Sequence, residues 1–542
     1  MERPPRLLLL AALLAAAVYL PRLCAPLVWD DLIVIVQNPK LLAPVPWRAY
    51  VSSAYFQFSG NDTWRPLGTL TTRAVARVAG ASPGGNRLPW VLLHLATGLL
   101  LAALAASIGL APETAAWAGA LFLLHPAHVE TLMCASFNED VLVGAALCAM
   151  LLAHRNRRRG LAAAFYACAM LSKESGVLGL PLVMLMDLLA PAEPQRPRPG
   201  ARRYAFYVVA AAAYLYLRFG PLAGPQAEHG LAAGIGWGDR IPFAAKAWLT
   251  DLRIFALPLR PQLEYFALPA TSRLEAAACL AAASAALACF CLAAWRLRAP
   301  GASRSRQALF FLLWPLPFLA LTSPLVPANI LNLRLTAERY LYLPCLGAAA
   351  ALAWALRRRP AVLTAVLLAW AGLAASRAAD WSQEAKLWSS LASIYPWSAK
   401  AQEGLGEAFL RESRYPEAAA AFRAALDLRA QRRDLVLAHY VPLTRELSWE
   451  SPGAHRGLAL ADLRLGRLDE AEAEFRRAAD VAPTAEAFSL RALAYLQAAR
   501  GRFAQARRTA EEGLAREPGD EMLEKIKKDA EKGRLSFRAN FY

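Results

Sequence analysis

The sequence predicts an all-α protein in two parts. We expect a polytopic membrane helix bundle over residues 1–379, followed by an α-solenoid of helical repeats over 380–542. The chain of 542 residues is 57% hydrophobic and only 19% charged, whereas soluble domains are about 45–50% apolar and about 25% charged. Apolar stretches long enough to cross a bilayer recur in the first part, and a repeat period of about 34 residues follows them.

Charge is distributed unevenly between the two parts. Residues 1–379 hold 34 basic and 17 acidic side chains, and residues 380–542 hold 26 basic and 25 acidic ones. The excess positive charge therefore lies in the apolar part. A membrane protein with basic inner loops explains this, whereas a nucleic-acid-binding protein would carry the excess on a soluble face. All eight cysteines precede residue 346 and no CxxC occurs, so the spacing predicts neither a disulfide framework nor a zinc site.

Eleven apolar stretches are candidates for membrane helices. They cover residues 6–26, 88–110, 114–133, 139–154, 160–190, 203–219, 242–258, 274–296, 307–327, 339–356 and 360–379. The start of the chain has the pattern of a signal peptide, but no A-x-A site follows, and we expect an uncleaved first span. The stretch 160–190 contains a Ser-Lys-Glu-Ser break and can form two short helices that meet at one membrane face. The stretch 242–258 carries three charges and can lie at the interface instead of crossing.

Basic clusters orient the predicted bundle. They occur near the N-terminus and at 155–159, 196–203, 296–306 and 357–359. Because basic loops face the cytoplasm, the segments 29–87, 125–138 and 328–339 and the whole C-terminal part are expected on the opposite, outer side.

The polar part contains an internal repeat. Ala418, Phe422 and Ala425 follow the small–aromatic–small spacing of the second helix of a tetratricopeptide (TPR) repeat, and the same half-motif recurs at Trp388 and Phe475. A further copy begins at residue 506, and an insertion of roughly 19 residues near 431–452 interrupts the array. Stacked helix pairs of this kind form a solenoid with a concave face for a protein partner.

Charged side chains gather at the outer ends of the predicted spans. Such groups are costly to place at a membrane and are frequently functional. The catalytic candidates are Asp30 and Asp31, which open the first outer loop. The candidates for binding the donor phosphate or the substrate are Arg65, His125, His128, Glu130, Glu139, Asp140, Lys173, Glu174, Glu338, Arg339 and Tyr340. Their convergence on one face predicts a site that meets a polar headgroup there.

The chemistry of these side chains suits sugar transfer from a lipid-phosphate donor. Asp30 or Asp31 can position or deprotonate an acceptor hydroxyl, or hold a divalent cation such as Mg²⁺ or Mn²⁺. Arg65, Lys173 or Arg339 can neutralise the leaving phosphate, and arginine offers a bidentate fork.

Structural alternatives stay open for each motif. The acidic pair can cap the helix that follows it, and the Lys-Glu pair can be a local ion pair. Two histidines three residues apart, His125 and His128, can bind a metal together with Glu130. A plain polar turn at Pro126 explains the same residues.

Taken in order, the motifs resemble a known family. WDD and NP are followed by RPL, HPxHxE, NED, SKE, ERYLYLP and then the repeats. This order resembles the transmembrane-and-TPR O-mannosyltransferase-like proteins of the GT-C glycosyltransferase superfamily. The resemblance implies a GT-C-type membrane domain with a lumenal or periplasmic active site. It also implies a polyprenyl-phosphate sugar donor, with mannose or another hexose, and transfer to a protein hydroxyl. The acidic pair of that superfamily is catalytic and is matched by Asp30 and Asp31.

Two features depart from that family. Asn138 stands where relatives often have arginine, and the repeat array is short and interrupted. The Ala-, Leu- and Arg-rich composition is typical of a GC-rich bacterium, so we expect an inner-membrane protein with an extracytoplasmic repeat domain. The donor would be undecaprenyl-linked, and the acceptor would be a protein or an envelope glycan.

Two other function classes compete with a transferase. A non-catalytic membrane scaffold would use the repeats to recruit envelope partners, but an anchor needs only one span and no outer acidic cluster. A transporter is expected to place polar residues near the midplane and to contain inverted repeats, and neither feature is found in the sequence.

Overall fold

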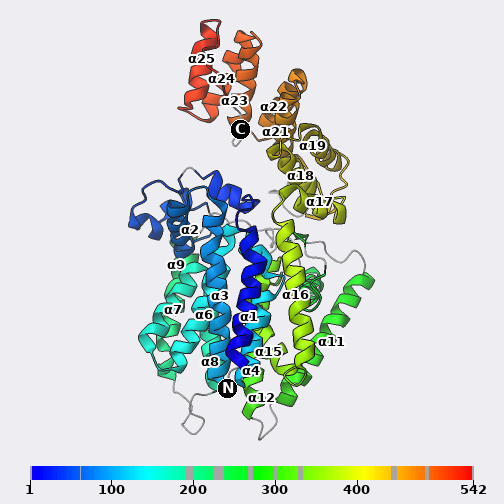
Figure 1. Ribbon diagram of the computed structural model, residues 1–542. Coiled ribbons are helices and arrows are strands. Elements are labelled where there is room, and N and C mark those ends of the chain that lie inside the picture. Colours follow the sequence, from blue (N-terminus) through cyan, green and yellow to red (C-terminus); the bar gives the residue numbers. More distant parts are fainter. Residues whose placement is uncertain are drawn as a thin grey trace. The chain divides into compact units, whose positions relative to one another are not determined.

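The computed structural model describes residues 3–38, 40–60, 63–190, 201–223, 237–259, 262–266, 273–297, 303–326, 334–440, 449–482 and 487–539. The chain divides into two compact units, Met1–Gln383 and Glu384–Tyr542. Both units are helical (Figure 1), as predicted. Parts of the basic clusters at 196–203 and 296–306, much of the segment 328–339 and much of the insertion near 431–452 fall outside the described residues.

The first unit is a bundle of long and short helices. Its α-helices are α1 (Arg3–Tyr19), α2 (Pro66–Ala79), α3 (Pro83–Ile108), α4 (Pro112–Leu124), α5 (His128–Met133), α6 (Asn138–Arg155), α7 (Arg159–Ser172), α8 (Gly179–Leu189), α9 (Ala205–Phe219), α10 (Trp237–Ala256), α11 (Arg273–Leu297), α12 (Ser303–Leu313), α13 (Pro315–Thr322), α15 (Tyr342–Ala355) and α16 (Pro360–Asp380). Tighter helical turns include η2 (Leu32–Val36), η3 (Trp47–Val51), η4 (Ser53–Gln57), η5 (Ala135–Phe137), η6 (Glu174–Leu178) and η10 (Glu338–Leu341). One short antiparallel ladder, β1 (Tyr265–Phe266) with β2 (Arg334–Thr336), is the only strand pairing among the described residues.

In the part of the chain that the structure describes, four helical segments are long and apolar enough to cross a membrane. They are α3, Ala135–Arg155 (which contains α6), α11 and α16, and α7, α9 and the segment Arg306–Thr322 are shorter apolar helices. A helix rises about 1.5 Å per residue, so only segments of about 20 residues span the hydrocarbon core without help. The membrane-bundle part of the predicted fold is therefore confirmed. The described residues contain fewer full-length spans than the eleven apolar stretches suggested.

Breaks inside two apolar stretches explain the difference. The stretch 114–133 ends as α4 at Leu124 and resumes as α5 at His128, because Pro126 lies between them. The stretch 160–190 forms α7 and α8 with η6 between them, so the prediction of two short helices is confirmed. Each break places polar side chains at the end of a helix.

The two ends of the bundle differ in charge. Helix α6 begins beside α2, where Asn138 donates a hydrogen bond to Thr72, and its 18 residues end at Arg155. Helix α16 likewise begins after the basic residues 357–359 and ends at Asp380. The N-terminus lies at the end of the bundle away from α2 (Figure 1). The basic residues at 155–159 therefore lie one helix length, about 27 Å, from the end that carries the acidic candidates.

The second unit consists of helix pairs that pack in sequence order. Its helices are α17 (Glu384–Ile394), α18 (Ala399–Arg411), α19 (Tyr415–Ala430), α20 (Leu435–Tyr440), α21 (Pro452–Arg464), α22 (Leu468–Val481), α23 (Ala487–Ala499), α24 (Phe503–Arg516) and α25 (Glu521–Glu531). Each of α18–α19, α21–α22 and α23–α24 is an adjacent packed pair. Phe422 of α19 is buried and packs against two glycines of neighbouring helices. A Cβ added at Gly406 would lie 2.9 Å from the Phe422 ring, and a Cβ added at Gly457 would lie 2.3 Å from it. The small and aromatic positions of the repeat thus serve close helix packing, and the predicted solenoid is confirmed.

Candidate active site

Asp31 is locked into the wall of the bundle. Its carboxylate is fully buried and accepts hydrogen bonds from the backbone amides of Ala135 (3.1 Å) and Ser136 (2.8 Å) and from the Cys134 thiol (3.4 Å). The Arg87 guanidinium lies 3.9 Å from Oδ2. Burial raises the pKa of Asp31, and Arg87 and the three donors only partly oppose this effect. With both oxygens occupied, the side chain ties the segment that follows α1 to the turn before α6.

Asp30 lies in a different environment from its neighbour. It is half-buried, and within the described part of the chain its carboxylate makes no hydrogen bond. It interacts electrostatically with Arg339. The preceding residue, Trp29, has a left-handed backbone with φ +56°, which costs a non-glycine residue about 1 kcal/mol or more. The ring of Trp29 packs edge-on against Phe137 (5.6 Å between centroids), which fixes this turn.

Arg339 joins the first outer loop to the helical turn η10. Glu130 of α5 binds it twice, through the Arg339 backbone amide (2.9 Å) and through an ion pair with the guanidinium. The guanidinium also lies over the rings of Phe137 (4.3 Å), Tyr340 (5.2 Å) and Trp29 (5.6 Å). Burial lowers the pKa of Arg339, but the neighbouring Glu130 more than reverses this, so the net shift is upward and the side chain stays charged.

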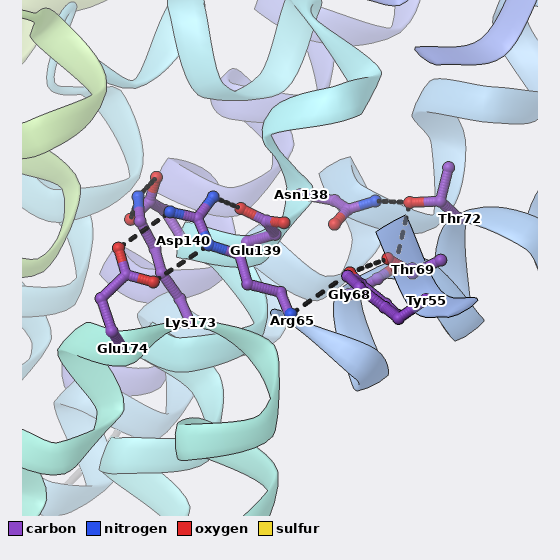
Figure 2. Close-up of polar contacts among 10 residues, drawn as sticks. All are labelled: Tyr55, Arg65, Gly68, Thr69, Thr72, Asn138, Glu139, Asp140, Lys173 and Glu174. Atoms are coloured by element: carbon purple, nitrogen blue, oxygen red, sulfur yellow. Dashed lines mark hydrogen bonds and ion pairs between the residues drawn. The ribbon is translucent and has the colours of Figure 1, made fainter. Parts of the chain in front are cut away.

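A second charged cluster lies between α2, α6 and η6 (Figure 2). Arg65 donates to both oxygens of Glu174 (3.0 and 2.8 Å) and to Glu139 (2.5 Å). Lys173 donates to both oxygens of Asp140 at 2.7 Å. Burial raises the pKa of Glu174, but Arg65 outweighs it, and the resulting pKa is about 2. Three carboxylates thus face two cations, and every nitrogen of the Arg65 guanidinium already has a carboxylate partner.

Tyr340 connects the two clusters. The Lys173 ammonium lies 5.9 Å from the centre of its ring, and Arg339 lies over the same ring. The structure therefore brings Asp30, Lys173, Arg339 and Tyr340 into one neighbourhood, with Glu130 and Asp140 as the partners of the two cations. The outermost of these residues in the sequence, Asp30 and Tyr340, are more than 300 positions apart, and Lys173 lies between them.

The two histidines of the HPxHxE motif point away from this neighbourhood. His125 donates from Nε2 to the Phe255 carbonyl (3.1 Å) and is stacked on the Phe255 ring. His128 is buried among the rings of Phe122 (4.6 Å) and Tyr342 (4.8 Å). Because Glu130 binds Arg339, the expected metal set of His125, His128 and Glu130 is not assembled.

Glu338 also faces away from Arg339. Its Oε1 accepts hydrogen bonds from the Gln262 amide (2.9 Å) and the Tyr265 hydroxyl (3.2 Å), and its Oε2 lies 3.6 Å from Nε of Arg377. Burial raises the pKa of Glu338 to about 7, although Arg377 opposes the shift. It lines a cavity of about 210 Å³ whose other walls include Arg253, Ile254, Leu257, Pro258 and Tyr265.

Several residues that hold the site were not singled out from the sequence. Arg87 donates to the backbone carbonyls of Met133 (2.7 Å), Leu23 (3.1 Å) and Pro26 (2.8 Å) and so fixes the end of the first span. Tyr55 shares a 2.5 Å hydrogen bond with Thr69 and accepts one from the Arg65 amide (3.2 Å; Figure 2). The sequence signal for Arg87 was its position as a lone arginine at the start of a long apolar helix. No comparable signal marks Tyr55 or Thr69.

Sequence comparison finds relatives over part of the chain. No family model matches. Protein O-mannosyl-transferase Tmtc2 of Drosophila melanogaster is 26% identical over 267 residues, which are 45% of this chain and 28% of that protein. Protein O-mannosyl-transferase tmtc2 of Xenopus laevis is 32% identical over 201 residues, which are 33% of this chain and 24% of that protein. The chain therefore spans about a quarter of the length of the curated relatives it matches.

Two solved structures share a low overall similarity with the chain. The archaeal oligosaccharyltransferase AglB from Archaeoglobus fulgidus, in complex with an inhibitory peptide and a dolichol-phosphate, is 14% identical. It covers 77% of this chain and 59% of its own, with a TM-score of 0.38. The APC/C heterotetramer Cut9–Hcn1 is 15% identical and covers 89% of this chain and 92% of its own, with a TM-score of 0.24. The chain is thus a helical protein with four candidate membrane spans among its described residues and a distant sequence similarity to protein O-mannosyl-transferases.

Proposed function

We propose that the protein is a membrane glycosyltransferase that uses a polyprenyl-phosphate sugar. The observation that carries the proposal is the contrast within the acidic pair. Asp31 is buried and fully hydrogen-bonded, whereas Asp30 is half-buried beside Arg339 and makes no hydrogen bond among the described residues. A carboxylate with free lone pairs next to a cation suits a general base that meets an anionic substrate. The distant similarity to O-mannosyl-transferases supports the same class of reaction.

In the proposed reaction, Asp30 accepts the proton of an acceptor hydroxyl as its oxygen attacks the anomeric carbon of the sugar. The new bond joins that oxygen to the anomeric carbon. The bond from the carbon to the phosphate oxygen breaks, and its electron pair leaves with the lipid phosphate. Asp31 acts as a positioning residue, because it holds the loop that carries Asp30.

The phosphate would meet Arg339 and Lys173 rather than Arg65. Arg339 gives one side-chain hydrogen bond to Glu130, and Lys173 gives two to Asp140. A guanidinium has five N–H donors and an ammonium three, so both side chains keep donors for a phosphate. Arg65 would first have to release Glu139 or Glu174. We therefore assign Arg65 a structural role with its two carboxylates.

The location and the other partners belong to the same proposal. The basic end of the bundle would face the cytoplasm of a bacterium, which puts Asp30 on the extracytoplasmic side of the inner membrane. The sugar would be mannose or another hexose. The acceptor would be a protein or an envelope glycan, and a protein would bind on the concave face of the repeats.

The test is transfer of a labelled sugar from a polyprenyl-phosphate donor by the purified full-length protein. Asp30→Asn should lower the rate about 100-fold or more, the usual contribution of a general base. Asp31→Asn should lower both the transfer rate and the melting temperature. One of the two carboxylate oxygens that accept a backbone N–H is then replaced by an NH₂ group, which is itself a donor. Glu113→Gln is the matched control, since Glu113 is exposed in the first turn of α4. Equal transfer rates for wild type and Asp30→Asn would overturn the assignment of Asp30, and absence of transfer by the wild type would favour the scaffold alternative.

A further inference from the structure

Two histidines and a cysteine meet in the interior of the first unit. His125 follows α4, His128 begins α5, and Cys345 lies in α15, and one potential ligand atom from each lies within 4.8 Å of the other two. All three residues are buried. The spacing of the sequence did not reveal this group, because Cys345 is 217 positions after His128 and belongs to no paired-cysteine motif.

The group contains polar atoms without partners. Neither ring nitrogen of His128 makes a hydrogen bond of normal geometry, although the residue is fully buried. An unsatisfied buried polar group costs about 1–3 kcal/mol, so such groups in folded proteins point to a missing partner. His125 is oriented by the contact of its Nε2 with the Phe255 carbonyl. That is the usual outer partner of an imidazole that binds a metal through Nδ1, and Nδ1 has only a 3.2 Å contact from the Ala127 amide to give up.

A buried carboxylate interacts with the thiol without belonging to the group of three. Asp251 of α10 is 4% exposed and interacts electrostatically with Cys345. Within the described residues it accepts one hydrogen bond, from Thr336 (2.5 Å), and forms no ion pair. An uncompensated buried carboxylate is expensive. A divalent cation bound by two neutral imidazoles and one thiolate carries one net positive charge, which the Asp251 carboxylate would offset from outside the ligand set.

We propose that His125, His128 and Cys345 form a buried site for a divalent transition metal of the zinc class, with Asp251 outside the ligand set. Nitrogen and sulfur ligands suit zinc. Mg²⁺ and Mn²⁺ favour oxygen ligands, so we do not expect this site to select them. The metal is structural, because it joins the end of α4, the start of α5 and α15 at one point. Binding releases the Cys345 thiol proton to solvent. Helix α5 also carries Glu130, so the metal helps to hold the partner of Arg339.

The experiment measures metal binding and not transfer, so its result is independent of the proposed function. Full-length protein is purified without a polyhistidine tag, stripped with a chelator and titrated with Co²⁺ and then Zn²⁺. Wild type should take up one Co²⁺ per chain, show thiolate-to-cobalt charge-transfer absorption and tetrahedral visible bands, and lose both when Zn²⁺ is added. Cys345→Ser should lose the charge-transfer band, and His128→Gln should bind the metal at least about tenfold more weakly.

The matched control is Cys148→Ser, a buried cysteine of α6 outside the group, which should keep the wild-type spectrum. If the two ligand variants fail to fold, X-ray absorption of the wild-type zinc form still decides. It should show one sulfur at about 2.3 Å together with nitrogen or oxygen ligands. Failure of the wild type to bind the metal, a spectrum unchanged by Cys345→Ser, or a shell without sulfur would each overturn the proposal.

Discussion

The two units use charge in opposite ways. In the first unit, the ion pairs Glu130–Arg339 and Asp140–Lys173 are almost entirely withdrawn from solvent, and Glu130 and Arg339 are 209 positions apart in the sequence. In the second unit, pairs such as Glu511–Lys527 are exposed and join neighbouring helices of the solenoid. A buried ion pair is costly to form, and removal of one partner strongly destabilises the protein. An exposed ion pair contributes little to the free energy of unfolding. The difference indicates that charges in the first unit are retained for the site, and charges in the second for solubility.

The largest effect is expected from removal of one member of a buried pair. Glu130→Gln leaves the Arg339 guanidinium without its carboxylate in a buried position, since the Glu130 side chain is 1% exposed. The free energy of unfolding should fall by about 3–5 kcal/mol, measured by thermal unfolding in detergent. Transfer activity should fall with it. A variant as stable as wild type would show that the pair is solvated and would remove the contrast between the units.

The repeat unit should be more sensitive to packing than to charge. In Gly457→Ala the new methyl would lie 2.3 Å from the Phe422 ring, and such overpacking costs about 1–3 kcal/mol. Amide hydrogen exchange of α19 and α21 in the full-length protein should accelerate accordingly. Gly453→Ala in the same helix is the matched control, because the nearest atom to its Cβ would be 3.8 Å away. Equal exchange in the two variants would contradict the close contact.

Local patterns predicted the fold better than they predicted the site. The repeat was visible because Phe422 and its small partners recur with a short period and contact neighbouring helices. The break near Lys173 was visible for the same reason, since a charged pair interrupts an apolar stretch locally, whereas the turn at Pro126 was only an alternative to a continuous span over 114–133. The partners of Asp31, in contrast, lie 104 and 105 positions away, and those of Arg65 lie 74 and 109 positions away. Sequence alone could therefore name the charged candidates but could not say which are bound to one another and which stay accessible.

A pH-dependent effect of intermediate size is expected at Glu174. Its folded-state pKa of about 2 lies below the ordinary value of 4.5, because the charge of Arg65 outweighs the cost of burial. A depressed carboxyl pKa stabilises the fold above pH 4.5 and loses that contribution as the pH falls toward 2. Wild type should therefore lose more stability than Glu174→Gln between pH 6 and about pH 3, measured by thermal unfolding. Parallel curves for the two proteins would contradict the ion pair with Arg65.

The smallest effect is expected at an exposed pair of the second unit. The Lys527 ammonium lies 3.4 Å from Glu511, and both side chains are more than a third exposed. Lys527→Ala keeps the helix propensity of α25 and removes only a screened attraction, so the free energy of unfolding should change by less than about 1 kcal/mol. The change should shrink further as salt is added. Because Glu130→Gln and Lys527→Ala each remove one charge from one ion pair, burial is the variable that separates them. A loss at Lys527 comparable to that at Glu130 would mean that burial does not set the value of these pairs, and the functional interpretation of the first unit's charges would lose its physical basis.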